Sequence, residues 1–314
     1  MNKLIVSSSP HIHTKQTTHK IMRDVLIALL PAVAAAILFF GTRALMILAV
    51  CVGSCVISEF IFNLITKKKQ TVGDLSACVT GVLLALSIPA TAQIWHGVVG
   101  SVFAIVVVKC LFGGIGCNFA NPAIAARVFL LTAFATSIGG GTITKFQNPD
   151  LVASATPLEL IENGEISNLP SLLDMFIGNR GGAIGETCAI ALILGGLYLI
   201  VRKVIGWTTP LVFISTVFVL SLIVKQDLSI AIYEVLGGGV IIGAFFMATD
   251  YSTSPINKSG KVLFAFGCGL ITVLIRFWGT YPEGVSYAIL IMNIVTPYID
   301  KICTKKPLGK VGNK

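Results

Sequence analysis

The stretch MRDVLIALLPAVAAAILFFG, residues 22–41, decides the fold class of this chain. Beyond Arg23 and Asp24 at its beginning, it contains no charged side chain. A helix rises about 1.5 Å per residue, so about 20 apolar residues cross the roughly 30 Å hydrocarbon core of a bilayer. The stretch therefore predicts a transmembrane helix.

Similar apolar runs recur along the whole chain. Of the 314 residues, 55% are hydrophobic and only 12% are charged, about half of the roughly 25% charged residues in a soluble domain. We predict an all-α polytopic membrane protein with about ten transmembrane helices. The predicted spans are 22–41, 44–65, 76–92, 94–112, 123–139, 184–201, 208–225, 229–248, 261–278 and 285–302.

Basic residues are unequally shared between the two ends of these spans. With the N-terminus in the cytoplasm, most lysines and arginines fall on the cytoplasmic side, Lys109 and Arg127 among them. The basic residues left outside are Arg43, Lys145, Arg180, Lys225 and Arg276. This is the asymmetry of the positive-inside rule, so we predict that both termini are cytoplasmic. The same rule accounts for the net charge of +9, and we expect no nucleic-acid partner.

One long hydrophilic loop, residues 140–183, follows the fifth span and is therefore predicted to be extracytoplasmic. It is too small to form an enzyme domain, so chemistry must occur at the membrane or on partner subunits. The predicted parts are an N-terminal arm (1–21), five spans (22–139), the loop (140–183), five spans (184–302) and a basic tail (303–314).

The sequence SATP in this loop places Thr156 before Pro157. A residue before proline is pushed toward extended backbone, so we expect the Thr156 hydroxyl to face solvent. Ser154 and Ala155 are small and would let a second enzyme approach. A threonine hydroxyl is a weak nucleophile without a base, and no histidine lies nearby, so modification by another enzyme is favoured over self-catalysis. The alternative is that SATP is only a helix N-cap before LELIE.

The heptapeptide DLVASAT, residues 150–156, resembles the flavinylation signature Asp-x-x-Ser/Thr-Gly-Ala-Thr. In proteins with this signature, a flavin transferase attaches FMN through its phosphate to the final threonine. Asp150, Ala155 and Thr156 match the signature. An alanine and Ser154 stand where the signature has a hydroxyl residue and glycine.

Three other segments are similar to the D subunit of Rnf-type ion-translocating electron transport complexes. They are SSPHIHTKQTTHKIMRDVLIALLPA (8–32), GGIGCNFANPAIAARVF (113–129) and MATDYSTSP (247–255). The resemblance extends over essentially the whole chain. The B subunit of the sodium-pumping NADH:quinone reductase is related, but it normally carries a longer N-terminal extension.

The resemblance implies a flavin-carrying subunit of a complex in a bacterial inner membrane. Such a complex couples electron transfer between ferredoxin and NAD to Na⁺ or H⁺ translocation. It implies covalent FMN on Thr156, with Asp150, Ser154 and Ala155 in the recognition motif, and a second, non-covalent flavin such as riboflavin. The implied partners are subunits A, B, C, E and G, and a flavin transferase for maturation.

This chain would then be one part of an oxidoreductase and translocase, without a complete active site of its own. The GGIG at 113–116 lacks a following βαβ pattern, so NAD binding would belong to partner subunits. Two alternatives stay open: a quinone-reductase-type subunit, and a solute channel or carrier without a redox cofactor.

Ionisable side chains inside spans cost roughly 2.5–3.5 kcal/mol at the bilayer centre, so each needs a reason. Glu59 and Glu234 are candidates for an ion path. The alternative for Glu59 is pairing with the lysines at 67–69. Lys109 is expected to extend its amine to the cytoplasmic surface.

Two polar breaks are predicted on the cytoplasmic side. The first contains Asn118 and Asn121 before Pro122, and the second contains Asp250 before Pro255. Non-helical backbone at membrane depth lines cavities and ion sites, so Asp250, Asn118 and Asn121 join the ion-path candidates. The matching placement of the two breaks is compatible with an internal repeat. No metal site is predicted, since the eight cysteines include no CxxC pair.

Overall fold

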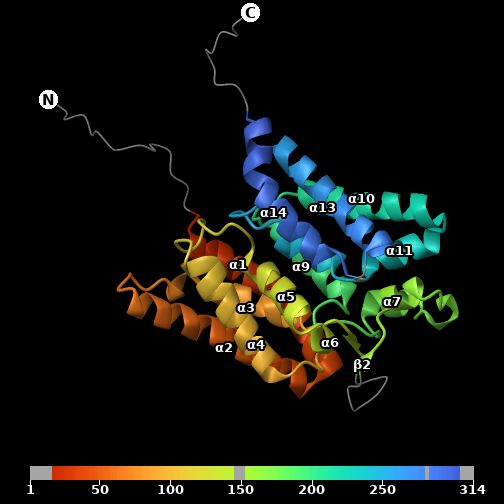
Figure 1. Cartoon of the computed structure of the whole chain (residues 1–314), viewed down its shortest axis with the longest axis horizontal. Helices are drawn as coiled ribbons and strands as arrows, with labels where there is room; N and C mark the ends of the chain where they lie inside the picture. Colours follow the sequence, from red (N-terminus) through yellow and green to blue (C-terminus); the bar gives the residue numbers. More distant parts are fainter. Residues whose placement is uncertain (1–15, 145–152, 280–282, 305–314) are drawn as a thin grey trace, which may run out of the picture.

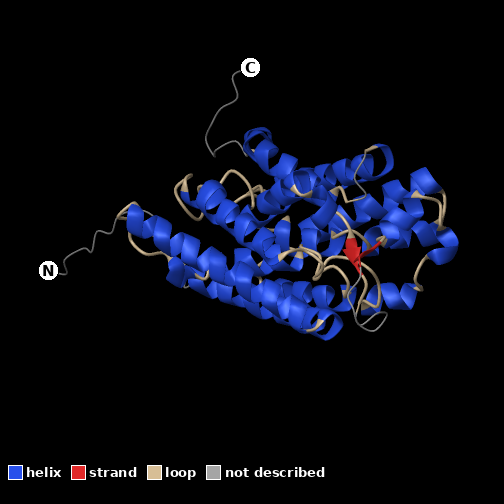
Figure 2. Cartoon of the chain, turned by 60° about the horizontal axis from the view of Figure 1, so that its bottom comes forward, coloured by secondary structure: helices blue, strands red, loops and turns tan. Residues whose placement is uncertain are grey.

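The computed structural model describes residues 16–144, 153–279 and 283–304. Most of the predicted N-terminal arm and most of the basic tail lie outside these ranges. Within them, the protein is nearly all helical, with one short pair of antiparallel strands (Figures 1 and 2). The prediction of an all-α polytopic membrane protein is confirmed.

The helices fall into two groups separated by the hydrophilic loop. The first group comprises α1 (Thr18–Phe40), α2 (Thr42–Ile65), η1 (Val72–Asp74), α3 (Ser76–Leu86), α4 (Ile94–Val102), η2 (Phe103–Cys110), α5 (Pro122–Ala133) and α6 (Ala135–Ile138). The loop holds β1 (Gly141–Thr142), β2 (Ala153–Ser154), α7 (Pro157–Glu162), η3 (Ile166–Asn168) and α8 (Leu172–Ile177). The second group comprises α9 (Ala189–Val201), α10 (Thr208–Lys225), α11 (Leu228–Leu236), α12 (Val240–Ile242), η4 (Gly243–Met247), α13 (Lys258–Trp278) and α14 (Val285–Ile302).

Length and composition mark five of the described helices as able to cross a membrane: α1, α2, α10, α13 and α14. The pair formed by α11 and the segment Val240–Met247 would be a sixth, bent by 59°. Four shorter apolar helices complete the set: Ser76–Leu86, Ile94–Cys110, Pro122–Ala133 and Ala189–Val201. Each of the ten predicted runs therefore contains helix.

Several predicted spans are shorter or more interrupted than expected. The run 229–248 is broken at Gly238 and Gly239, whose φ angles of +57° and +73° lie in the left-handed region that favours glycine. The run 76–92 leaves its helix at Leu86, just before Pro89, which has no N–H to continue the ladder. Short helices and breaks bring irregular backbone to membrane depth, where it must line a cavity or be buried.

The two groups of helices share one core. α1 packs on α9, and α5 packs on α14. The approach of α9 to α1 is close at Gly195, where a Cβ atom would lie 2.1 Å from the carbonyl oxygen of Ala28. Small residues permit such contact between membrane helices.

Candidate functional site

A cavity lies where the two helix groups meet, and we call it the central cavity. Its volume is about 90 Å³. α1, α3, α9 and η4 contribute its apolar wall. Its polar lining consists of Ser76, Thr80, Lys109, Asn118, Asn121, Thr249, Asp250, Tyr251 and Ser252.

The two predicted polar breaks meet at this cavity. The Nδ2 atom of Asn118 lies 3.4 Å from Oγ of Ser252, and Nδ2 of Asn121 lies 3.5 Å from the carbonyl oxygen of Met247. Asn121 also begins α5, because its Oδ1 accepts the backbone N–H of Ala123 at 3.0 Å. Each break follows a π-helical segment, η2 or η4. The structure therefore brings Asn118, Asn121 and Asp250 together.

Asp250 stands in the second break with a ring of donors around its carboxylate. It accepts from the Ser252 N–H at 3.3 Å, from the Ser252 hydroxyl at 3.0 Å and from the Thr253 hydroxyl at 3.2 Å. Burial raises the pKa of Asp250, and the three hydrogen bonds only partly offset that effect. The group can therefore change protonation state at a higher pH than an exposed aspartate.

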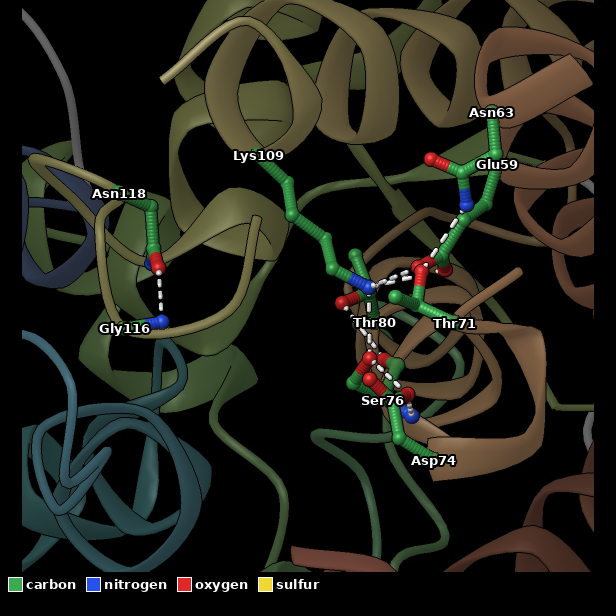
Figure 3. Close-up of polar contacts among 9 residues, drawn as sticks. All are labelled: Glu59, Asn63, Thr71, Asp74, Ser76, Thr80, Lys109, Gly116 and Asn118. Carbon is green, nitrogen blue, oxygen red and sulfur yellow. Dashed lines mark hydrogen bonds and ion pairs between the residues drawn. The ribbon is translucent and has the colours of Figure 1, made fainter. Parts of the chain in front are cut away.

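Lys109 and Glu59 form a buried ion pair beside the cavity. The Nζ atom of Lys109 donates to both Glu59 carboxylate oxygens at 2.9 Å and to Oγ of Ser76 at 2.6 Å (Figure 3). The expectation that Lys109 extends to the surface was wrong, and the alternative in which Glu59 pairs with the lysines at 67–69 is replaced by pairing with Lys109. A partner from another helix is available at hydrogen-bond distance, so neither charge needs to reach water.

Glu234 lies at the end of α11, where it pairs with Arg276 of α13. The Nη1 atom of Arg276 is 2.8 Å from Oε2 of Glu234. The other terminal nitrogen of Arg276 donates to the carbonyl oxygens of Gly237 and Gly238 at 3.2 and 3.3 Å. The guanidinium thus satisfies carbonyls left open by the break between α11 and α12.

Arg127 holds together a third buried cluster. Its Nη1 donates to Oε1 of Glu186 at 2.7 Å, and its Nη2 pairs with Glu283. These glutamates precede α9 and α14, at the end of the bundle opposite Asn121. The Arg127 side chain therefore points away from the end of the bundle that holds Asn121, toward the segments that precede α9 and α14. A central arginine can point along its helix to partners on either side, which sequence position alone does not reveal.

Thr156 has the extended backbone expected before proline, with φ −75° and ψ 156°. The residue is only 5% exposed, so the expectation of a solvent-facing hydroxyl was wrong. The hydroxyl accepts the Glu159 N–H at 3.3 Å, and the Glu159 carboxylate accepts the Thr156 N–H at 2.6 Å. This reciprocal capping box begins α7, so the alternative interpretation of SATP as a helix N-cap is confirmed. Asp150 lies outside the described residues.

A second cavity, which we call the loop pocket, lies beside Thr156. It has a volume of about 360 Å³, within the roughly 300–1,000 Å³ of ligand sites. Its lining is Ile143, Ser154, Ala155, Pro157, Leu160, Asn168, Pro170, Arg180 and Gly181. Ser154 and Ala155 of the predicted motif therefore face a space of ligand size.

Arg180 is the charged member of the loop pocket. It is 2% exposed and donates to the carbonyl oxygens of Glu186 and Leu236, both at 2.7 Å. Burial lowers the pKa of Arg180 to about 10, so the side chain remains cationic at neutral pH. Within the described part of the chain, Arg180 forms no salt bridge. A buried guanidinium that lines the pocket and is bonded only to carbonyl oxygens among the described residues favours an anionic ligand there.

Sequence reasoning missed the roles of Arg127 and Arg276. Both were counted only as topology markers, although an arginine inside a predicted span carries the same desolvation cost as a glutamate. That cost was the available signal for Arg127 and Arg276. Among the described residues, no three His, Cys, Asp or Glu side chains are grouped as metal ligands.

Comparison with known proteins gives a consistent result over the whole chain. The model of the NQR2, RnfD, RnfE family matches residues 5–309. The D subunit of the Na⁺-translocating ferredoxin:NAD⁺ oxidoreductase complex of Acetobacterium woodii is 50% identical, covering 98% of this chain and 95% of the relative. The D subunit of the proton-translocating ferredoxin:NAD⁺ oxidoreductase complex of Clostridium ljungdahlii is 38% identical, covering 98% and 97%. The D subunit of an ion-translocating oxidoreductase complex of Methanosarcina acetivorans is 34% identical over the full length of both chains.

Proposed function

Because this chain belongs to the NQR2, RnfD, RnfE family, we propose that it is the D subunit of an ion-translocating ferredoxin:NAD⁺ oxidoreductase complex. In this role it carries electrons through the membrane part of the complex, while partner subunits bind ferredoxin and NAD. The loop 140–183 faces away from the cytoplasm. The partners are subunits A, B, C, E and G of the complex, together with the flavin transferase that loads the cofactor.

The cofactor is FMN, joined through its phosphate to Thr156. The observation that carries this proposal is the loop pocket, which is of ligand size and is lined by Ser154 and Ala155 of the motif. Ile143, Leu160 and Pro170 offer an apolar wall to a flat ring, and Arg180 offers a positive charge for the phosphodiester. When bound, FMN supplies an electron carrier that takes up one or two electrons.

The buried hydroxyl sets a condition on the attachment. Thr156 Oγ1 must form the bond to the flavin phosphorus, while an activated donor, a phosphoanhydride of FMN, loses its nucleotide half. The hydroxyl proton passes to a base of the transferase. Since Oγ1 is held by the cap of α7, the transferase acts on a loop in which this cap is open.

A second, non-covalent flavin such as riboflavin needs a larger space than the central cavity offers. The cavity has suitable hydrogen-bonding groups, but about 90 Å³ holds only a few water molecules. The residues present do not fit a flavin at this volume. We therefore assign the central cavity to the ion.

The proposed ion path passes through the central cavity. Asn118, Asn121 and Asp250 supply amide and carboxylate oxygens, the ligands that suit Na⁺, and Asp250 also suits a proton. Glu59 and Glu234 are already neutralised by Lys109 and Arg276, so they would take part by exchanging these partners. The coupled ion is Na⁺ or H⁺.

Mass spectrometry of the peptide that contains Thr156 tests the flavin proposal. Protein from cells that possess the transferase should carry the mass of FMN less water on this peptide. It should also give a band that fluoresces under ultraviolet light after denaturing electrophoresis, and Thr156→Val should lose both signals. An unmodified peptide would favour the alternative, a channel or carrier without a redox cofactor.

A further inference from the structure

An apolar groove runs along the outside of the bundle between α9 and α10, and we call it the α9–α10 groove. Its volume is about 460 Å³. It is lined by Leu197, Ile200, Trp207, Pro210, Leu211, Ile214, Ser215, Phe218 and Phe245. The only hydroxyl in this lining, that of Ser215, already donates to the Val212 carbonyl oxygen at 3.1 Å. The groove therefore suits a hydrocarbon ligand.

The length of the groove matches one leaflet of a bilayer. Its α10 wall runs along one helix face from Trp207 to Phe218. At about 1.5 Å per residue this is roughly 16 Å, close to half of the roughly 30 Å hydrocarbon core. A single acyl chain, entering at the end where α9 turns into α10, fills such a length.

The mouth of the groove carries groups that recognise an anionic lipid head. Trp207 is 63% exposed there, and tryptophan concentrates at the membrane–water boundary. Arg202 and Lys203 occupy the preceding turn and are exposed. The Nη2 atom of Arg202 forms a salt bridge with Oδ2 of Asp24 at 3.2 Å. Lys203 forms no salt bridge within the described residues. Basic side chains beside a membrane helix attract anionic head groups.

Phe245 connects the groove to the interior. Its ring lines both the α9–α10 groove and the central cavity. Gly196 makes room for it, because a Cβ atom there would lie 2.3 Å from the ring. One aromatic side chain of η4 thus separates the polar cavity from the bilayer at this point.

We propose that the α9–α10 groove binds one acyl chain of an anionic glycerophospholipid whose phosphate lies at Arg202 and Lys203. The chain packs on the outer face of the Phe245 ring and closes the cavity wall toward the bilayer. This inference is independent of flavin attachment.

The test uses the purified complex, depleted of lipid in detergent and then titrated with phosphatidylglycerol or phosphatidylcholine. Native mass spectrometry counts the retained lipids. Ser215→Phe fills the groove and should remove one phosphatidylglycerol per complex, while Ile223→Phe, an exposed site of α10 outside the groove, should remove none. Lys203→Gln should weaken the preference for phosphatidylglycerol over phosphatidylcholine about fivefold.

Equal lipid counts in the wild type and Ser215→Phe would overturn the proposal. So would complete cross-linking of Ser215→Cys to another subunit, because the groove would then hold a protein helix. An unchanged lipid preference in Lys203→Gln would remove the head-group assignment. Each outcome is read without any measurement of flavin or electron transfer.

Discussion

Glu59 of α2 and Lys109 of η2 form an ion pair from which water is excluded: their side chains are 1% and 4% exposed. Neither charge has a second partner of opposite sign among the described residues. Removing one member of such a pair leaves the other charge buried, and this costs more than removing both. The pair also borders the central cavity through Lys109, so its state bears on the proposed ion path.

Lys109→Met should therefore destabilise the protein strongly, by about 3–5 kcal/mol. The double variant Glu59→Gln with Lys109→Met should recover most of that loss. Thermal melting of the detergent-solubilised complex gives the comparison, with Lys68→Met as an exposed control. If the melting temperature of the double variant falls by the sum of the decreases seen in Glu59→Gln and Lys109→Met, the two residues are not coupled.

Glu159→Ala should speed flavin attachment to the folded protein. Without the carboxylate, the Thr156 N–H loses its acceptor and only the backbone N–H of residue 159 still holds the Thr156 hydroxyl. The weakened cap should open more often, at a cost to α7 of about 1 kcal/mol. The experiment follows in-gel flavin fluorescence over time, with purified transferase and an activated flavin donor. Glu162→Ala, in the same helix but outside the cap, is the control. Identical rates in all three proteins would show that the cap does not limit attachment.

Asp250→Asn should slow ion transport at least tenfold (about 1.4 kcal/mol per tenfold change) without changing flavin attachment. Among the described residues, its carboxylate is the one anionic group that lines the central cavity. The raised pKa of Asp250 also predicts how wild-type transport depends on pH. As the pH falls, the Asp250 carboxylate should take up its proton, and transport should decline, at a higher pH than for an exposed aspartate. Transport is measured in proteoliposomes across a pH series. Asp227→Asn, the exposed cap of α11, should behave as the wild type. Normal transport by Asp250→Asn would remove this residue from the path.

Glu283 predicts a dependence of stability on pH. Burial raises its pKa from 4.5 to about 7, assisted by Glu186 and opposed by Arg127. The folded state therefore binds the proton more tightly than the unfolded state. Its contribution to stability is fully present below pH 4.5, declines as the pH rises to about 7, and is constant above that. Melting curves at pH 5 and 8 should differ less in Glu283→Gln than in the wild type; an equal difference would contradict this assignment.

The sequence predicted those features that depend on local physics. Apolar length placed all ten helical runs, and Pro157 set the extended backbone of Thr156. The burial of Thr156 could not be foreseen, because it depends on β1, which covers the threonine methyl group: a Cβ atom on Gly141 would lie 2.9 Å from it. A rule about neighbouring residues says nothing of a strand that arrives from elsewhere in the loop.

The same limit applies to the charged residues. Glu59, Glu234 and Asp250 could be recognised because a carboxylate is rare in or beside an apolar segment. The partners of Glu59 and Glu234 could not be recognised, since Lys109 and Arg276 reach these glutamates from helices distant in sequence. The three consecutive glycines at 237–239 indicate a helix break in the sequence. The arginines that donate to the carbonyl oxygens at this break come from α13 and the loop, and their positions could not be predicted.

The gap between α11 and α12 turns peptide oxygens toward the middle of the protein, which is how many carriers hold a naked cation. Here Arg276 occupies the oxygens of Glu234, Gly237 and Gly238, and Arg180 occupies that of Leu236. Sodium arriving at this depth would meet positive charge in place of vacant ligands. The charge of Arg276 would oppose the passage of a cation through the gap, and such passage would require Arg276 to release these oxygens first.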